Sequence, residues 1–480
     1  MSSGLSFAST NVWTIILFMA LVMGGLLVGN TLKRYIPFLR KSLIPVSVIG
    51  GIFLLLVSTI FKFTAGEYLF NLPVFSEGAS MTGIEALEVL TYHCLAVGFI
   101  AMTLRKSDNK GKGKGRVNEV INTGITTVST YLLQGFVGLA ITVVASFMIP
   151  TLIKASGIIL SFGFGQGTGQ ALNYGSIYEN EYGFLGGKSF GLTIAALGFL
   201  AASIGGVIYL NYHKRKGDIV IREAAAQLNT ELVEEDGEVP MVDSIDKLTL
   251  QIALVFICYA STFTIMIILG KLVGKGLVTT IYGFNFLFGA LSAVIVKEII
   301  KILRKTNLMH RDYVNNFLLN RIAGFAFDIM IVAGIGAIRV DLIKDYWVVL
   351  LILAVVGVLV TFLYIKLVSF KLFPKYAHEQ FMVMYGMLTG TASTGVILLR
   401  EIDPSYETPA SNIYIVSQFP AMLFVAPLLL LLELSASSLK GCYIAMGIFG
   451  GLFVLYTVFL ILSPKIFAKI AEKKEEKAKE

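Results

Sequence analysis

An apolar segment at residues 158–172 has a spacing of glycines that no regular helix uses. Every second position from residue 163 to residue 169 is glycine, and polar side chains lie among them at Gln166, Thr168 and Gln170. Each glycine costs a helix roughly 1 kcal/mol relative to alanine, so the helix is expected to break here. Uncovered N–H groups can bind a carboxylate, and uncovered C=O groups can bind a cation. The alternative explanation is close helix packing through small residues.

A second segment, residues 382–399, repeats this pattern with hydroxyl groups in place of several glycines. Its hydroxyl side chains belong to Thr389, Thr391, Ser393 and Thr394. Together with backbone carbonyls, these groups are the neutral oxygen ligands that a small, hard cation accepts. The alternative is that the hydroxyl groups bond back to carbonyls of their own helix.

Two charged residues near these segments each have two interpretations. Arg400 directly follows the second segment. It is predicted either to bind a substrate carboxylate through paired hydrogen bonds or to anchor the segment at the membrane interface. Asp328 is the acidic residue placed deepest in an apolar span, where a carboxylate normally faces a cavity or a partner. It is a candidate cation ligand or proton site, and the alternative is an ion pair with Arg321 or Arg339.

Other polar residues in or near the spans are assigned simpler roles. Glu85 and Glu88 lie near a membrane edge and are predicted to be solvated. Gln134, Asn285 and Gln418 lie inside spans. They either line the site or join neighbouring helices by hydrogen bonds.

The elements that position these residues are predicted to be transmembrane helices. The chain of 480 residues is 56% hydrophobic and 15% charged, with a mean hydropathy of +0.78. That composition leaves too little polar surface to cover a soluble core of this size. Apolar blocks long enough to cross about 30 Å of hydrocarbon predict an all-α polytopic membrane protein. The predicted crossings are residues 12–28, 44–61, 84–104, 125–149, 189–210, 248–269, 281–300, 322–338, 347–367, 413–432 and 442–462.

The two interrupted segments are interpreted as re-entrant hairpins rather than crossings. With the N-terminus outside, this topology places most of the 39 lysines and arginines in inner loops. The central linker and the C-terminal tail are then cytoplasmic, as the positive-inside rule requires. If both segments crossed instead, the basic cluster at residues 214–216 would lie outside.

The order of the elements repeats along the chain. Five crossings with a hairpin between the fourth and fifth occupy residues 1–210, and the same order recurs in residues 248–432. A linker at residues 211–247, with one short helix predicted near residues 224–232, separates them, and an extra helix with a charged tail follows at residues 433–480. Because each repeat crosses an odd number of times, the second is predicted to be inverted. Inverted repeats with broken segments at matching positions are typical of secondary transporters.

Other classes of function are excluded by the sequence. The four histidines are scattered, so no metal cluster or catalytic triad is indicated. Residues 186–189 (GGKS) resemble the end of a phosphate-binding loop, but Tyr182 stands where such a loop needs an earlier glycine. The net charge of +8 follows from the basic inner loops, so no nucleic-acid partner is predicted. We therefore expect no enzymatic activity, and an ion gradient is expected to drive transport.

Two motifs resemble the glutamate:sodium symporter family. One is I-P-x-x-V-x-G-G at residues 44–51, and the other is G-x-G-T-G at residues 165–169, followed by Y-G-F at residues 182–184. Residues 390–404 look like one branch of the same family. The resemblance covers residues 12–432 in element order. It implies sodium-coupled uptake of glutamate, an elevator-like movement of the hairpin-bearing part, and a homodimer.

The resemblance also implies where the substrate binds. Seven candidates are positions that match the family's motifs, and Gln166 and Arg400 are added because of their own side-chain chemistry. The candidate substrate-binding set is therefore Gly165, Gln166, Gly167, Thr168, Gly169, Gly390, Thr391, Thr394 and Arg400. Gln166 stands where the family often has histidine. The candidate sodium ligands are Thr389, Ser393 and Asp328.

The expected function is therefore sodium-coupled symport of glutamate or a similar small acidic solute. The protein is expected in the inner (plasma) membrane, with sodium as coupling ion and no organic cofactor. One alternative is a sodium- or proton-coupled carrier of another carboxylate, such as citrate or malate, because backbone donors bind any carboxylate. The other alternative is a passive anion channel.

Overall fold

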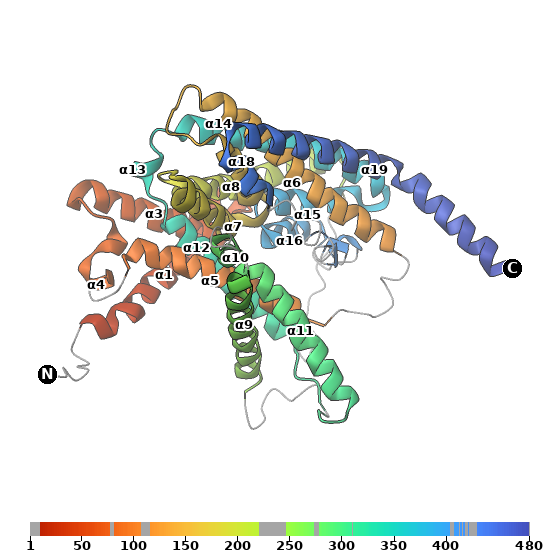
Figure 1. Cartoon of the computed structure of the whole chain (residues 1–480), viewed down its shortest axis with the longest axis horizontal. Helices are drawn as coiled ribbons and strands as arrows, with labels where there is room; N and C mark the ends of the chain where they lie inside the picture. Colours follow the sequence, from red (N-terminus) through yellow and green to blue (C-terminus); the bar gives the residue numbers. More distant parts are fainter. Residues whose placement is uncertain are drawn as a thin grey trace.

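The computed structural model describes residues 10–76, 81–106, 116–219, 246–272, 278–309, 311–403, 408–411, 413–414, 416–417, 421 and 430–479. Every regular element in these ranges is a helix (Figure 1). Up to the linker they are α1 (Thr10–Tyr35), α2 (Pro37–Lys41), α3 (Val46–Ala65), η1 (Leu69–Asn71), α4 (Pro73–Ser76), α5 (Gly83–Leu104), α6 (Val117–Ala145), η2 (Lys154–Ile158), α7 (Ile159–Tyr182) and α8 (Gly187–Lys216). After the linker they are α9 (Lys247–Leu272), α10 (Val278–Gly283), α11 (Asn285–Lys305), α12 (Asn316–Gly336), α13 (Val340–Ile343), α14 (Trp347–Leu372), η5 (Pro374–Tyr376), α15 (Ala377–Thr389), α16 (Ala392–Arg400), α18 (Leu430–Ser437) and α19 (Leu439–Lys479).

Nine helices within the described ranges are long and apolar enough to cross a membrane. They are α1, α3, α5, α6, α8, α9, α12, α14 and α19. Each coincides with a predicted crossing, which confirms the prediction of an all-α polytopic protein. The predicted crossing at residues 281–300 begins at the end of α10 and continues, after a break at Phe284, as α11, whose apolar stretch is shortened by Lys297, Glu298 and Lys301. The predicted crossing at residues 413–432 lies largely outside the described residues.

Helix α8 extends past its predicted end at residue 210 and stops at Lys216. The basic side chains of its last turn interact favourably with the partial negative charge at a helix C-terminus. Gly217, with φ at +81°, then ends the helix in the left-handed conformation that glycine permits. The predicted linker is correspondingly shorter at its start, and the short helix predicted near residues 224–232 lies outside the described residues.

The helices pack into two bundles, and each bundle draws on both halves of the chain (Figure 1). The first bundle contains the first three long helices of each half: α1, α3, α5, α9, α11 and α12. The second bundle contains the later elements of each half: α6, α7, α8, α14, α15, α16, α18 and α19. The bundles meet mainly where α7 and α8 pack against α5 and α12.

Close contacts hold the helices of the second bundle together. Between α7 and α8, a Cβ atom on Gly175 would lie only 2.4 Å from the carbonyl oxygen of Gly187. No larger residue fits at that approach, so these two helices are held together along one glycine-lined face. The extra helix α19 belongs to the second bundle, because Phe449 packs beside Gly135 of α6 and the Thr457 hydroxyl lies 3.1 Å from that of Tyr364 in α14.

Candidate functional site

Helix α7 is broken at Gly167, in the middle of the glycine-rich segment. Gly167 has φ at +74° and ψ at −161°, a backbone conformation that is essentially restricted to glycine. On either side of it the rings of Phe162 and Tyr174 lie 3.8 Å apart between centroids. In an unbroken helix these residues would be separated by about 18 Å along the axis. The two arms of α7 therefore fold back on each other as a helical hairpin with its tip at Gly167.

The second interrupted segment has the same form. Helix α15 ends at Thr389, the backbone is non-helical at Gly390 and Thr391, and α16 begins at Ala392. The arms touch, because a Cβ atom on Gly395 of α16 would lie 2.4 Å from the carbonyl oxygen of Val383 in α15. This segment is also a helical hairpin, with its tip at residues 390–391.

The two tips meet in the second bundle. A Cβ atom on Gly167 would lie 2.5 Å from Cγ2 of Thr391 and 3.7 Å from the carbonyl oxygen of Gly390. The ring of Phe199 in α8 lies 3.3 Å from the same point. Four of the predicted substrate-binding residues are thereby brought to one place, since Thr394 lies one turn into α16 with its hydroxyl 3.4 Å from that of Thr391.

One turn of α6 holds both tips. The hydroxyl group of Tyr131 donates to the carbonyl oxygen of Gly165 at 3.2 Å, and the amide of Gln134 donates to the carbonyl oxygen of Leu388 at 2.8 Å. Residues three apart lie on the same helix face, which is why one helix reaches both hairpins. The sequence left Gln134 between two roles and gave no signal for Tyr131, because a tyrosine in an apolar span is ordinary.

The first tip also contacts the first bundle. The hydroxyl group of Thr168 donates to the carbonyl oxygen of Met330 in α12 at 3.2 Å. A Cβ atom on Gly169 would lie 2.8 Å from Leu95 of α5 and 2.9 Å from the sulfur of Met330. Two of the predicted site residues therefore lie at the boundary between the bundles.

Replacing Thr168 with valine is expected to weaken transport about fivefold, because one buried hydrogen bond contributes about 1 kcal/mol. The change keeps the shape of the side chain and removes the donor to Met330. The check is the initial rate of solute uptake into proteoliposomes. Thr193→Val is the matched control, since its hydroxyl bonds only to Ser189 within its own helix, and its rate is expected to equal that of wild type.

The arms of the first hairpin carry polar atoms without partners among the described residues. Gln170 is fully buried, and neither its Nε2 nor its Oε1 atom makes a hydrogen bond there. Oε1 of Gln166 and the hydroxyl group of Tyr174 are likewise buried and unpaired. An unsatisfied buried group costs about 1–3 kcal/mol. The first hairpin therefore carries hydrogen-bonding capacity that the described part of the chain does not use.

The predicted sodium ligands are not all brought together. Thr389 is buried beside the second tip, with its hydroxyl bonded to the carbonyl oxygen of Tyr385 in its own helix. A hydroxyl group bonded to its own helix is the alternative to cation binding that was considered for this segment. The side chain of Ser393 lies outside what the structure describes. Asp328 belongs to the first bundle, on an exposed face of α12, where the Ser47 hydroxyl at the start of α3 is a neighbour of its carboxyl group.

Arg400 lies at the base of the second hairpin. It is exposed at the end of α16, about 12 Å along the helix from the tip. This position favours the anchoring interpretation over direct contact with a substrate at the tips. Partial burial raises the pKa of the next residue, Glu401, and the nearby positive charge of Lys33 in α1 opposes that rise.

The expectation that Glu88 is solvated is wrong. Its side chain is 9% exposed, and Oε2 lies 2.8 Å from Nζ of Lys188. Arg339, the alternative partner of Asp328, instead lies 3.2 Å from Glu179. From its position in the sequence, Glu88 was expected at the membrane edge. Its ion pair could not be predicted, because the partner belongs to a helix that is distant in the chain.

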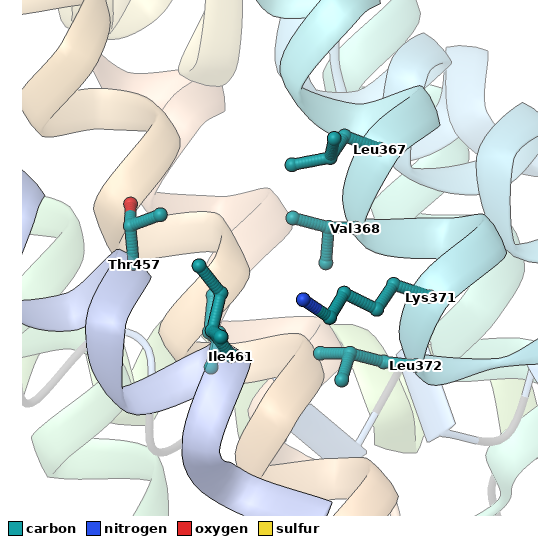
Figure 2. A pocket seen from close by; sticks show the side chains of 7 residues that line it. Leu367, Val368, Lys371, Leu372, Thr457 and Ile461 are labelled. Atoms are coloured by element: carbon teal, nitrogen blue, oxygen red, sulfur yellow. The ribbon is translucent and has the colours of Figure 1, made fainter.

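Two grooves of the described part of the chain lie away from the hairpin junction. Figure 2 shows one between α14 and α19, lined by apolar side chains together with Lys371 and Thr457, with a volume of about 10 Å³. That is room for about one water molecule, so no carboxylic acid fits. A larger groove of about 300 Å³ lies against α9 and α11 in the first bundle and has no charged residue in its lining. The first groove is too small for a carboxylic acid, and the second has no charged group to pair with an anion.

Comparison with known proteins agrees with this architecture. The model of the sodium/glutamate symporter family matches residues 10–390, which is more than half of the chain and extends from α1 to the second tip. No individually curated protein matched the chain. The family is one of membrane transporters rather than enzymes, and the apolar helices described above are those of a multi-pass membrane protein. The chain belongs to the sodium/glutamate symporter family.

Proposed function

We propose that this protein is a secondary active transporter that couples the entry of sodium to the uptake of glutamate or a similar small acidic solute. The solute binds at the junction of the two hairpin tips. The observation that carries this proposal is the contact of Gly167 with Thr391, because it joins the tips of two helical hairpins that come from different halves of the chain. Membership of the sodium/glutamate symporter family supports sodium as the coupling ion.

The chemistry of the tips suits a carboxylate. The second arm of α7 starts at Thr168 and α16 starts at Ala392, so two helix N-termini face the junction. Helix N-termini present free N–H groups and a partial positive charge, which stabilise an anion. The unpaired amide of Gln170, one turn from Gly167, adds a donor and an acceptor for a second polar group of the solute.

The same tips suit a small cation. The first arm of α7 and helix α15 end at the junction, so each tip also presents the carbonyl end of a helix. Carbonyl oxygens and a partial negative charge stabilise a bound cation. Sodium held there neutralises the solute's negative charge, which is the physical basis for binding both together.

Two bundles that share a limited interface support an elevator-like movement. In this proposal the second bundle, with both hairpins, slides against the first and carries the solute across the membrane. The hairpins are re-entrant and enter from opposite sides, because the two repeats are inverted. The family resemblance supports a homodimer in which the first bundle is the stationary part.

Uptake of labelled glutamate into proteoliposomes tests the proposal. With sodium only outside, saturable uptake against a concentration gradient is expected, and replacing sodium with potassium is expected to reduce it to the background of empty vesicles. Equal uptake in potassium would exclude sodium coupling. Unlabelled citrate and malate are the competitors that identify another carboxylate as the solute, and failure of counterflow would indicate a passive channel.

A further inference from the structure

Four charged side chains form a square where the two bundles meet. Glu88 belongs to α5 of the first bundle, and Arg339 is joined to α12 of that bundle by the short stretch before α13, a helix that also packs against α8. Glu179 of α7 and Lys188 of α8 belong to the second bundle. Each bundle thus contributes one acid and one base. All four side chains are largely shielded, with exposed fractions of 9% for Glu88, 27% for Arg339 and 17% for each of the other two.

The distances within the square follow a pattern. The pairs that cross the interface are short, at 2.8 Å for Lys188 with Glu88 and 3.2 Å for Arg339 with Glu179. The pairs inside each bundle are longer, at 4.0 Å for Lys188 with Glu179 and 3.7 Å for Arg339 with Glu88. Every charge therefore has one close partner across the interface and a second partner in its own bundle.

Main-chain bonds fix the square to the ends of helices. The amide nitrogen of Lys188 donates to Oε2 of Glu179 at 3.1 Å, which keeps this acid and this base together in the second bundle. The amide nitrogen of Arg339 donates to the hydroxyl of Ser189 at 2.9 Å across the interface. The acid–base pair of the second bundle therefore has a bond that a sliding movement leaves intact.

We propose that Glu88, Lys188, Glu179 and Arg339 form a partner-exchange latch that sets the balance between two positions of the bundles. In the latched position the two crossing pairs are closed, as in this structure. When the bundles slide apart, Lys188 pairs with Glu179 and Arg339 pairs with Glu88, so neither bundle carries an unpaired charge. An isolated buried charge is strongly unfavourable, and the exchange avoids it. This inference rests on the movement proposed above.

Two double substitutions with the same change in net charge are expected to act in opposite directions. The first double variant, Glu88→Gln with Lys188→Met, keeps the pair of Arg339 with Glu179 across the interface. Once the bundles have moved apart, however, Arg339 and Glu179 have no partner within the square. This variant is expected to favour the latched position and to lower the maximal uptake rate about tenfold, with a smaller effect on KM. Glu179→Gln with Lys188→Met removes both crossing pairs and keeps Arg339 with Glu88, and is expected to favour the released position.

Distances between spin labels measure the two positions without solute or sodium. Met81→Cys before α5 and Leu185→Cys between α7 and α8 place one exposed label on each bundle near the square. The native residues Cys94, Cys258 and Cys442 are replaced by alanine. The first double variant is expected to enrich the short distance and the second the long distance. Glu88→Gln with Arg339→Gln, which keeps only the pair inside the second bundle, is a second test of release.

The proposal is overturned if both double variants shift the distance in the same direction or leave the parent distribution unchanged. A merely structural square predicts such equal effects, together with equal losses of melting temperature. If the two double variants shift the distance in opposite directions but the wild-type protein does not take up glutamate, the latch is supported and the proposed solute is rejected. If the wild-type protein takes up glutamate but the two double variants do not shift the distance in opposite directions, the proposed solute is supported and the latch is rejected.

Discussion

Replacing Gly167 with leucine is expected to reduce uptake to background while the protein still inserts and purifies as a single species. The backbone of Gly167 lies in a region that costs any other residue about 1–3 kcal/mol. A side chain there would also meet Thr391 at 2.5 Å, so the two tips could not touch. The loss arises at the junction rather than in the membrane helices. Uptake into proteoliposomes and elution from a sizing column measure the two effects separately.

Gly183→Leu is the matched control for this change. Gly183 ends α7 with φ at +70°, so leucine there carries a left-handed backbone cost of about 1–2 kcal/mol. No atom lies within 4 Å of the position that its Cβ would occupy. Uptake near the wild-type rate is expected. If Gly167→Leu transported equally well, close contact between the tips would be unnecessary for function.

Replacing Gln134 with methionine is expected to have the second largest effect. The fully buried amide of Gln134 is a donor to the carbonyl oxygen of Leu388, one of the last carbonyls of α15. Terminal carbonyls of a helix have no partner in their own helix. Leaving this one unsatisfied costs about 1–3 kcal/mol, which corresponds to about a five- to 150-fold loss of the binding-competent hairpin. The apparent KM for solute is expected to rise in that range.

Thr361→Val separates the two bonds that Gln134 makes. The amide of Gln134 also donates to the Thr361 hydroxyl at 2.8 Å, and valine removes that acceptor while leaving the bond to Leu388. The KM of this variant is expected to stay within about twofold of wild type, because the carbonyl oxygen of Leu388 beside the tip keeps its hydrogen-bond donor. A KM as high as that of Gln134→Met would show that the support of the second tip lies elsewhere.

The breaks in the two hairpins could be predicted from the sequence because their cause is local. Alternate glycines in residues 163–169 cannot continue a helix, and the structure breaks it at Gly167. The lengths of the crossings were predictable for the same reason, since length and apolarity are properties of a segment by itself. The ends of helices were harder to predict, as the end of α8 at Lys216 shows, because a charged last turn can extend a helix beyond the apolar block.

The environment of individual polar residues could not be predicted, because it depends on helices that are distant in the chain. Glu88 looked like an edge residue until α7 and α8 placed Lys188 beside it. Tyr131 carried no signal, and its role follows from the return of the first hairpin toward α6. Asp328 was judged by depth alone, but the face of α12 on which it lies is set by packing against α3 and α5.

The attachment of both tips to one turn of α6 makes the two tips energetically dependent on each other. Opening either tip must break a hydrogen bond to Tyr131 or Gln134, or else shift α6 and with it the other tip. By reciprocity, a ligand that closes one tip then favours closure of the other by the same free energy. An ion alone or a solute alone gains only part of that stabilisation. In the symport proposed above, such mutual dependence suppresses slippage, which is the passage of one species without the other.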